Sequence, residues 1–166
     1  MEKIPTSSLV AMDAFTGSAP LRIELAYARP DNLLFGERIY RPEARLWLHE
    51  SLAAIVMNAA QDCFQNHSLR FVLYDGLRPV EAQEKMLLTR RVKENPRWLE
   101  EPRLLSPPGT GGHPRGMAID VALETAEGKL IDMGTPFDFL AADSSPQKNP
   151  AHRDYIHLDP GVRKNR

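Results

Sequence analysis

The sequence has little of three features that define whole classes of protein. It contains one cysteine, Cys63, in 166 residues, so no internal disulfide can form. It has no apolar run long enough to span a membrane, and Asp13 interrupts the apolar stretch that a secretory signal would need. We therefore expect no membrane association and a cytoplasmic location, with the periplasm as the alternative, because many periplasmic proteins also lack disulfides.

Neither sign of charge is in excess. The 21 Lys and Arg residues nearly balance the 22 Asp and Glu residues, which leaves a formal net charge of -1. A nucleic-acid partner is therefore not expected, because such proteins carry a basic surface. The 42% hydrophobic and 26% charged residues are typical of a globular protein. Without internal repeats or low-complexity tracts, residues 1–166 are predicted to form a single domain, and nothing in the pattern indicates an oligomeric state.

Hydrophobic periodicity predicts an α+β fold, with a small antiparallel sheet and helices packed on one side. The helices are expected from about residue 42 to residue 63 and over residues 80–94, and the strands over residues 69–74, 117–123 and 129–133. Cys63 falls on the apolar stripe of the first helix and is predicted to be a core thiol. The last two strands read as a hairpin. The N-terminal arm to about Tyr40 and the C-terminal segment are expected to be irregular.

A histidine and an aspartate stand close together in the run His113-Pro-Arg-Gly-Met-Ala-Ile-Asp120. The alternation over residues 117–123 places Asp120 on the same strand face as the small side chains of Ala118 and Ala122, and a glycine-rich loop precedes the histidine. Imidazole and carboxylate suit Zn²⁺, and a hydrolytic zinc site has three protein ligands with a fourth position for water. The run predicts two zinc ligands. The alternative is a solvated histidine beside a structural aspartate.

An arginine occupies the corner between the predicted strand and helix, in the run Tyr74-Asp-Gly-Leu-Arg-Pro79. Pro79 suits the first turn of a helix. The Arg78 guanidinium is permanently charged and can stabilise negative charge on an attacked carbonyl. The alternative is a structural arginine that pairs with Asp75.

These two runs and a third, Met133-Gly-Thr-Pro-Phe-Asp-Phe139, together resemble the D-alanyl-D-alanine dipeptidases, which are zinc peptidases that include the vancomycin-resistance dipeptidases. The three runs occur in the family's order, and the resemblance extends from about Ala26 to the C-terminus. It implies the Hedgehog/D,D-peptidase-like α+β fold.

The resemblance also implies roles for individual residues. His113 and Asp120 would bind one Zn²⁺ per chain, and Arg78 would stabilise the transition state. Asp138 would hold the free ammonium group of the substrate, for which a buried carboxylate is a suitable partner. The implied activity is zinc-dependent hydrolysis of the D-alanyl-D-alanine dipeptide to two D-alanines in cell-wall precursor or peptidoglycan turnover.

The chain departs from the family pattern at two places. Gly111 stands where the family usually has a serine, two residues before the zinc histidine. The Glu-x-x-His that gives the family its general base and third zinc ligand is absent. We therefore expect a domain truncated at its C-terminus, with Asp154 and His157 as a weak substitute for the base and the third ligand.

Because of these two departures from the family pattern, a function of a different class is a second possibility. Two ligands hold zinc less firmly than three, and without a base a water is not efficiently activated. The alternative function is therefore an inactive relative or a module that binds peptidoglycan fragments without cleaving them.

Overall fold

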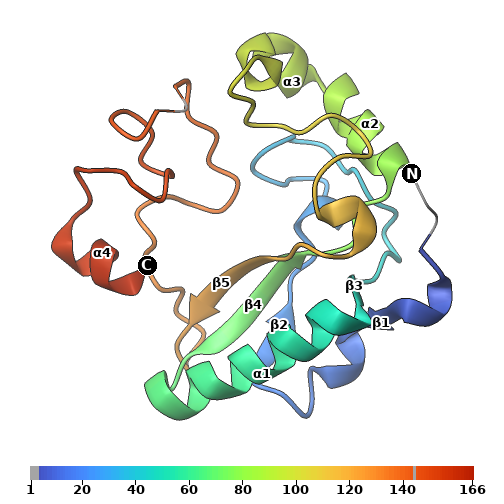
Figure 1. Cartoon of the computed structure of the whole chain (residues 1–166), viewed down its shortest axis with the longest axis vertical. Helices are drawn as coiled ribbons and strands as arrows, with labels where there is room; N and C mark the ends of the chain where they lie inside the picture. Colours follow the sequence, from blue (N-terminus) through green and yellow to red (C-terminus); the bar gives the residue numbers. More distant parts are fainter. Residues whose placement is uncertain (1–3, 144) are drawn as a thin grey trace.

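The computed structural model describes residues 4–143 and 145–166 and has the α+β fold that the sequence predicts. The larger sheet has three strands, β2 (Leu21–Ile23), β4 (Arg70–Asp75) and β5 (Asp120–Glu124), with β4 in the middle (Figure 1). Strand β4 is parallel to β2 and antiparallel to β5, so this sheet is mixed rather than wholly antiparallel. A second, antiparallel sheet joins β1 (Leu9–Ala11) to β3 (Trp47–His49).

The N-terminal arm is more ordered than expected. It supplies β1 and β2, together with the short 3₁₀ helices η1 (Thr6–Ser8), η2 (Met12–Phe15) and η3 (Ala26–Ala28). Strands of three residues are too short to show a clear apolar alternation, so their pairing with β3 and β4 is a tertiary effect.

Both predicted helices form with different bounds. The first, α1 (Glu50–His67), begins later than expected because the residues before it form β3, and the His49 ring caps it by accepting a hydrogen bond from the Ser51 N–H. The second is divided at Thr89 into α2 (Val80–Leu88) and α3 (Arg90–Glu94). The Thr89 backbone is extended, and its hydroxyl accepts a hydrogen bond from the Val92 N–H.

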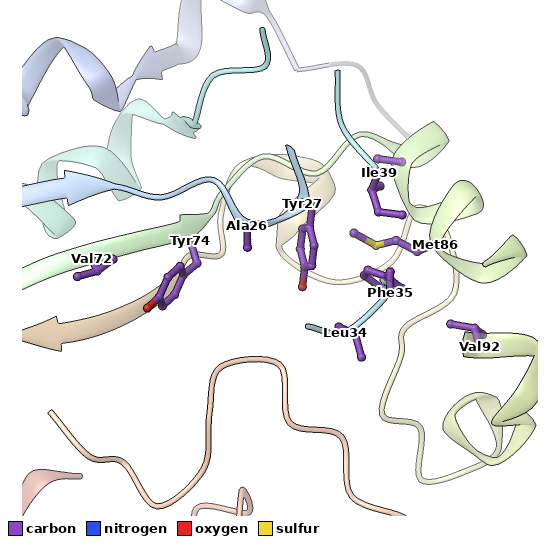
Figure 2. Close-up of a cluster of buried hydrophobic side chains, with 10 residues drawn as sticks. Ala26, Tyr27, Leu34, Phe35, Ile39, Val72, Tyr74, Met86 and Val92 are labelled. Atoms are coloured by element: carbon purple, nitrogen blue, oxygen red, sulfur yellow. The ribbon is translucent and has the colours of Figure 1, made fainter. Parts of the chain in front are cut away.

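The alternating side chains of β4 separate two hydrophobic clusters. Leu73 and Phe71 pack in the cluster that contains Val56 of α1, as expected for helices on one side of the sheet. Val72 and Tyr74 belong to the opposite cluster (Figure 2). That cluster also contains Tyr27 and Phe35 of the N-terminal arm and Met86 of α2, so helices contribute to both faces.

The chain beyond β5 has less regular structure than the predicted hairpin would give, and its final segment is mostly irregular, as predicted. The expected partner strand over residues 129–133 is reduced to a single bridge between Glu124 and Leu130. The irregular segment ends in the short helix α4 (Pro160–Asn165, Figure 1), where the Asn165 side chain donates to the Asp132 carbonyl at 2.8 Å. None of the described helices combines the length and the apolar character needed to cross a membrane. Cys63 is a half-buried free thiol on α1.

Candidate metal centre and active site

The site is built where β4 ends and its chain turns toward α2. A register shift between Leu73 and Asp75 places Asp75 opposite Asp120, the first residue of β5. Gly76 then passes so close to β3 that a Cβ on it would lie 2.6 Å from the Trp47 carbonyl oxygen. The Arg78 N–H donates to the His113 carbonyl at 3.0 Å. These backbone contacts bring the end of β4 against the loop that carries His113.

His113 and Asp120 present their side chains to each other as metal ligands would. His113 begins the 3₁₀ helix η5 (His113–Arg115), and its Nδ1 lies 2.8 Å from the Gly76 carbonyl oxygen. Nδ1 must carry the proton to donate to that carbonyl, which leaves the Nε2 lone pair facing Asp120. Nε2 lies 3.6 Å from Asp120 Oδ1. Two ligands of a tetrahedral zinc with bonds of 2.0–2.1 Å are about 3.4 Å apart, so the pair fits this metal.

The third member of this cluster is Asp75, which was not among the predicted ligands. One ligand atom from each of Asp75, His113 and Asp120 lies within 4.8 Å of the other two. Both carboxylate oxygens of the buried Asp75 are already occupied, because Oδ1 accepts from the Tyr40 hydroxyl at 2.7 Å and Oδ2 accepts from Arg78 Nε at 2.8 Å. Asp75 also faces His113 Nδ1, which is the ring nitrogen that hydrogen-bonds to the Gly76 carbonyl and therefore is not free to bind metal. These contacts assign Asp75 to holding Arg78 rather than to binding metal.

Arg78 lies at the strand-to-helix corner and is largely buried. Its guanidinium pairs with Asp75 at 2.7 Å and with Asp120 Oδ2 at 3.3 Å. It also lies over the ring of Tyr27, with 5.2 Å between Cζ and the ring centroid. Burial lowers the pKa of Arg78 more than any single neighbour raises it, but Asp75, Tyr27 and Tyr40 together outweigh burial, so the pKa is raised. The structural pairing that sequence reasoning gave as an alternative is therefore present, beside the predicted metal pair.

Asp138 lies in the same cavity with one carboxylate oxygen unused. Its Oδ1 accepts a hydrogen bond from the Tyr27 hydroxyl at 2.8 Å. Its Oδ2 is buried and has no hydrogen-bond partner among the described residues. Burial raises the pKa of Asp138 to about 7. The backbone at Asp138 is left-handed, with φ of 62°. An unpaired buried carboxylate oxygen of this kind calls for a cationic partner.

One cavity of about 260 Å³ brings the four predicted residues together. Arg78, His113, Asp120 and Asp138 all line it. Its remaining wall includes the apolar side chains of Leu34, Met86, Leu105 and Leu140. A cavity that combines apolar walls with a few converging charged groups is the usual form of a small-molecule site.

The weak substitute for the third ligand does not join this site. Asp154 and His157 are exposed, and among the described residues the metal-type cluster contains neither of them. The His157 ring packs edge-on against Tyr155 instead. The structure therefore gives no support to His157 as a zinc ligand.

Three supporting residues escaped the sequence reasoning. Tyr27 binds Asp138, Tyr40 binds Asp75, and the buried Gln83 binds the glycine loop through Gly109 and Thr110. Tyr27 lies in the N-terminal region that carries the family resemblance, which was the one available signal. Tyr40 and Gln83 are single residues without a motif.

The fold, the His–Asp pair and the buried arginine define this chain as a member of a peptidase family. The model of the Peptidase M15 family, described as D-ala-D-ala dipeptidase, matches residues 8–153, and the chain belongs to this family. It is similar in particular to the D-alanyl-D-alanine dipeptidase of Escherichia coli (strain K12), with 31% identity over 146 residues. The match covers 88% of this chain and 66% of that protein, so the chain spans just under two thirds of the relative's length.

Proposed function

We propose that this chain acts in the zinc-dependent hydrolysis of the D-alanyl-D-alanine dipeptide to two D-alanines. The observation that carries this proposal is the single cavity that combines the His113–Asp120 pair, Arg78 and the unpaired Asp138 oxygen. The family description and the name of the E. coli relative supply the dipeptide. A role in cell-wall precursor or peptidoglycan turnover follows from that substrate, and the single cysteine supports a reducing compartment such as the cytoplasm.

The metal proposed is one Zn²⁺ per chain, held by His113 Nε2 and Asp120. When bound, such an ion polarises the scissile carbonyl and lowers the pKa of a water molecule toward neutrality. The Gly76 carbonyl keeps the His113 ring in the tautomer that leaves Nε2 free. By the family resemblance, the third ligand and the general base belong to a Glu-x-x-His segment, which this sequence does not contain.

Arg78 is proposed to stabilise the oxyanion that forms on the attacked carbonyl. Asp75 and the Tyr27 ring hold its guanidinium in place before any substrate arrives. A charge that is already oriented costs little reorganisation during the reaction, and it acts more strongly in a site shielded from water.

Asp138 is proposed to bind the free ammonium group of the dipeptide. Its unused Oδ2 is available for a charge-assisted hydrogen bond, while Tyr27 fixes the other oxygen. An ammonium beside this carboxylate lowers its pKa, so Asp138 becomes ionised at neutral pH when the substrate binds. A requirement for a free amino terminus follows.

The test is the release of free D-alanine from D-alanyl-D-alanine by the 166-residue protein, with added zinc and after chelation. We expect release that depends on zinc and falls when the dipeptide is N-acetylated. Bound zinc in a folded sample that releases no D-alanine would contradict the proposed activity. It would instead support the alternative of an inactive or purely binding relative.

A further inference from the structure

Ser106 places an unused hydroxyl in the active-site cavity. It lies in the loop between the 3₁₀ helix η4 (Pro96–Leu99) and η5, and it lines the cavity together with Arg78 and His113. Within residues 4–143 and 145–166, its hydroxyl makes no hydrogen bond. Thr110, which lines the same cavity, donates its hydroxyl to the Pro107 carbonyl at 2.6 Å. Ser106 therefore offers a free donor where Thr110 does not.

The backbone at Gly111 leaves space beside this hydroxyl on the cavity wall. Gly111 has φ of +83°, a conformation in which a side chain is strained. A Cβ at that position would lie 4.0 Å from Ser106 Oγ. The hydroxyl of Ser106 thus borders the space that a side chain two residues before His113 would occupy.

The loop that carries Ser106 is anchored on both sides. The buried Gln83 accepts from the Gly109 N–H at 2.8 Å and donates to the Thr110 carbonyl at 3.4 Å. On the other side, the N–H groups of Leu104 and Leu105 both donate to the Trp98 carbonyl at 3.0 Å. A donor on an anchored loop loses little conformational freedom when a ligand binds.

The charges that line the cavity leave one end of a dipeptide without a partner. A free dipeptide carries an ammonium and a carboxylate, and Asp138 suits the ammonium. Among the described residues, Arg78 is the only Arg or Lys that lines the cavity, and the proposed function assigns it to the oxyanion of the attacked carbonyl. The carboxylate therefore has to be recognised by neutral donors, and a hydroxyl that donates to a carboxylate makes a strong hydrogen bond.

We propose that Ser106 is a specificity-determining residue whose hydroxyl donates a hydrogen bond to the C-terminal carboxylate of the dipeptide. This inference rests on the proposed function, because it takes the ligand to be a dipeptide with both ends free. It assigns the two ends to different elements, with the ammonium on Asp138 and the carboxylate on the loop before His113.

The test compares two probes that the protein cannot cleave, the phosphinate isostere of D-alanyl-D-alanine and its C-terminal carboxamide. Dissociation constants are measured by calorimetry on the zinc-loaded protein and its variants. Ser106→Ala should weaken binding of the acid about tenfold or more, since a hydrogen bond to a charged group is lost. Binding of the carboxamide should change less than about threefold, and Ser106→Thr, which keeps a hydroxyl, should retain most of the affinity for the acid.

Three results would contradict the inference. If the wild-type protein binds the acid and Ser106→Ala binds it equally well, the inference is wrong and the proposed function stands. If Ser106→Ala loses the same factor for acid and carboxamide, the hydroxyl does not recognise the carboxylate. If the folded, zinc-loaded wild-type protein binds neither probe, the proposed function fails and the inference fails with it.

Discussion

Asp138 combines the features that suit the charged ligand proposed for it. Its backbone is left-handed, its side chain lines the cavity, and Tyr27 occupies only one of its two carboxylate oxygens. Asp is one of the few residues besides glycine that tolerates this backbone, since its short polar side chain can bond locally. In the free protein the second oxygen is unpaired, so its ionised form is costly.

The Asp138 pKa predicts a specific dependence of stability on pH. It is about 7 in the folded protein, raised chiefly by burial from an ordinary value of 3.8. Between these values the folded state holds a proton that the unfolded state has lost. The contribution of Asp138 to the free energy of unfolding is therefore complete below about pH 3.8 and is lost as the pH rises through about 7. Asp138→Asn should remove this contribution, which we expect to be on the order of 3 kcal/mol.

Urea unfolding at pH 5 and pH 8 measures this contribution in the wild type and in Asp138→Asn. Because the two proteins share all other titrating groups, the difference between their pH profiles belongs to Asp138. The free energy of unfolding should fall more steeply with pH in the wild type than in Asp138→Asn. Parallel pH profiles would show that Asp138 has an ordinary pKa in solution.

His113 and Asp120 should determine zinc binding together. Removing either ligand should weaken zinc binding by more than the about 10- to 100-fold typical of losing an outer-shell partner. Equilibrium dialysis against buffered zinc measures this for His113→Ala and Asp120→Ala. His157→Ala is the matched control, because this histidine is exposed and lies outside the cluster. A loss of zinc in the control would make His157 a ligand in solution.

The turn after η5 holds the His113 loop against the end of β3. Gly116 has φ of +62°, and a Cβ on it would lie 2.8 Å from the His49 nitrogen. Its carbonyl also accepts from the His49 N–H at 2.9 Å. The His113 loop is therefore seated directly on the start of α1.

Gly116→Ala should consequently lower the free energy of unfolding more than the same substitution at a left-handed glycine without close neighbours. Gly128→Ala is the matched control, because Gly128 has φ of +82° but nothing within 4 Å of the added carbon. Both variants should lose about 1–2 kcal/mol from the left-handed backbone. Gly116→Ala should lose about 1–3 kcal/mol more from overpacking, and its zinc affinity should fall. Equal unfolding free energies would show that the turn relaxes without cost.

The elements differ in how far the sequence predicts them. Helix α1 was predictable because its apolar stripe repeats with the helical period over many residues, and strand β4 because a short apolar run ends at turn residues. The short strands β1, β2 and β3 were not, because they exist only through pairing with other segments. The helical pattern over residues 80–94 hid the break at Thr89, whose hydroxyl caps a new helix.

The candidate site was predictable where a residue carries its own chemistry in a motif, as His113 and Asp120 do. The supporting hydrogen bonds were not. Tyr40 reaches Asp75 across 35 positions of sequence, and Tyr27 reaches Asp138 across 111. Only the tertiary fold brings such partners together, so the sequence contains no motif or regular spacing that would predict them.

At the scale of the whole molecule, the site lies where segments packed in the two different hydrophobic clusters meet. Strand β4 contributes to both clusters, and the site lies at its end, where the His113 loop, β5 and the C-terminal segment meet. A ligand that binds only the folded arrangement stabilises the entire domain by mass action.

Zinc should therefore raise the melting temperature of the protein. At a free zinc concentration 100 times the dissociation constant, the expected gain is about 2.7 kcal/mol, which corresponds to about 5–11 °C for a domain of this size. Differential scanning calorimetry with zinc and with chelator measures the shift. His113→Ala should melt at the same temperature in both conditions, and a zinc-dependent shift in that variant would place the stabilising ion elsewhere.

The register shift in β4 has a consequence for how this site can change during evolution. It sets two acidic residues, Asp75 and Asp120, opposite each other on neighbouring strands, an arrangement that repels unless a cation intervenes. Arg78 is that cation, since it contacts both. A homologue that replaces Arg78 with a neutral residue should therefore also have replaced one of the two aspartates, so the three positions should vary together.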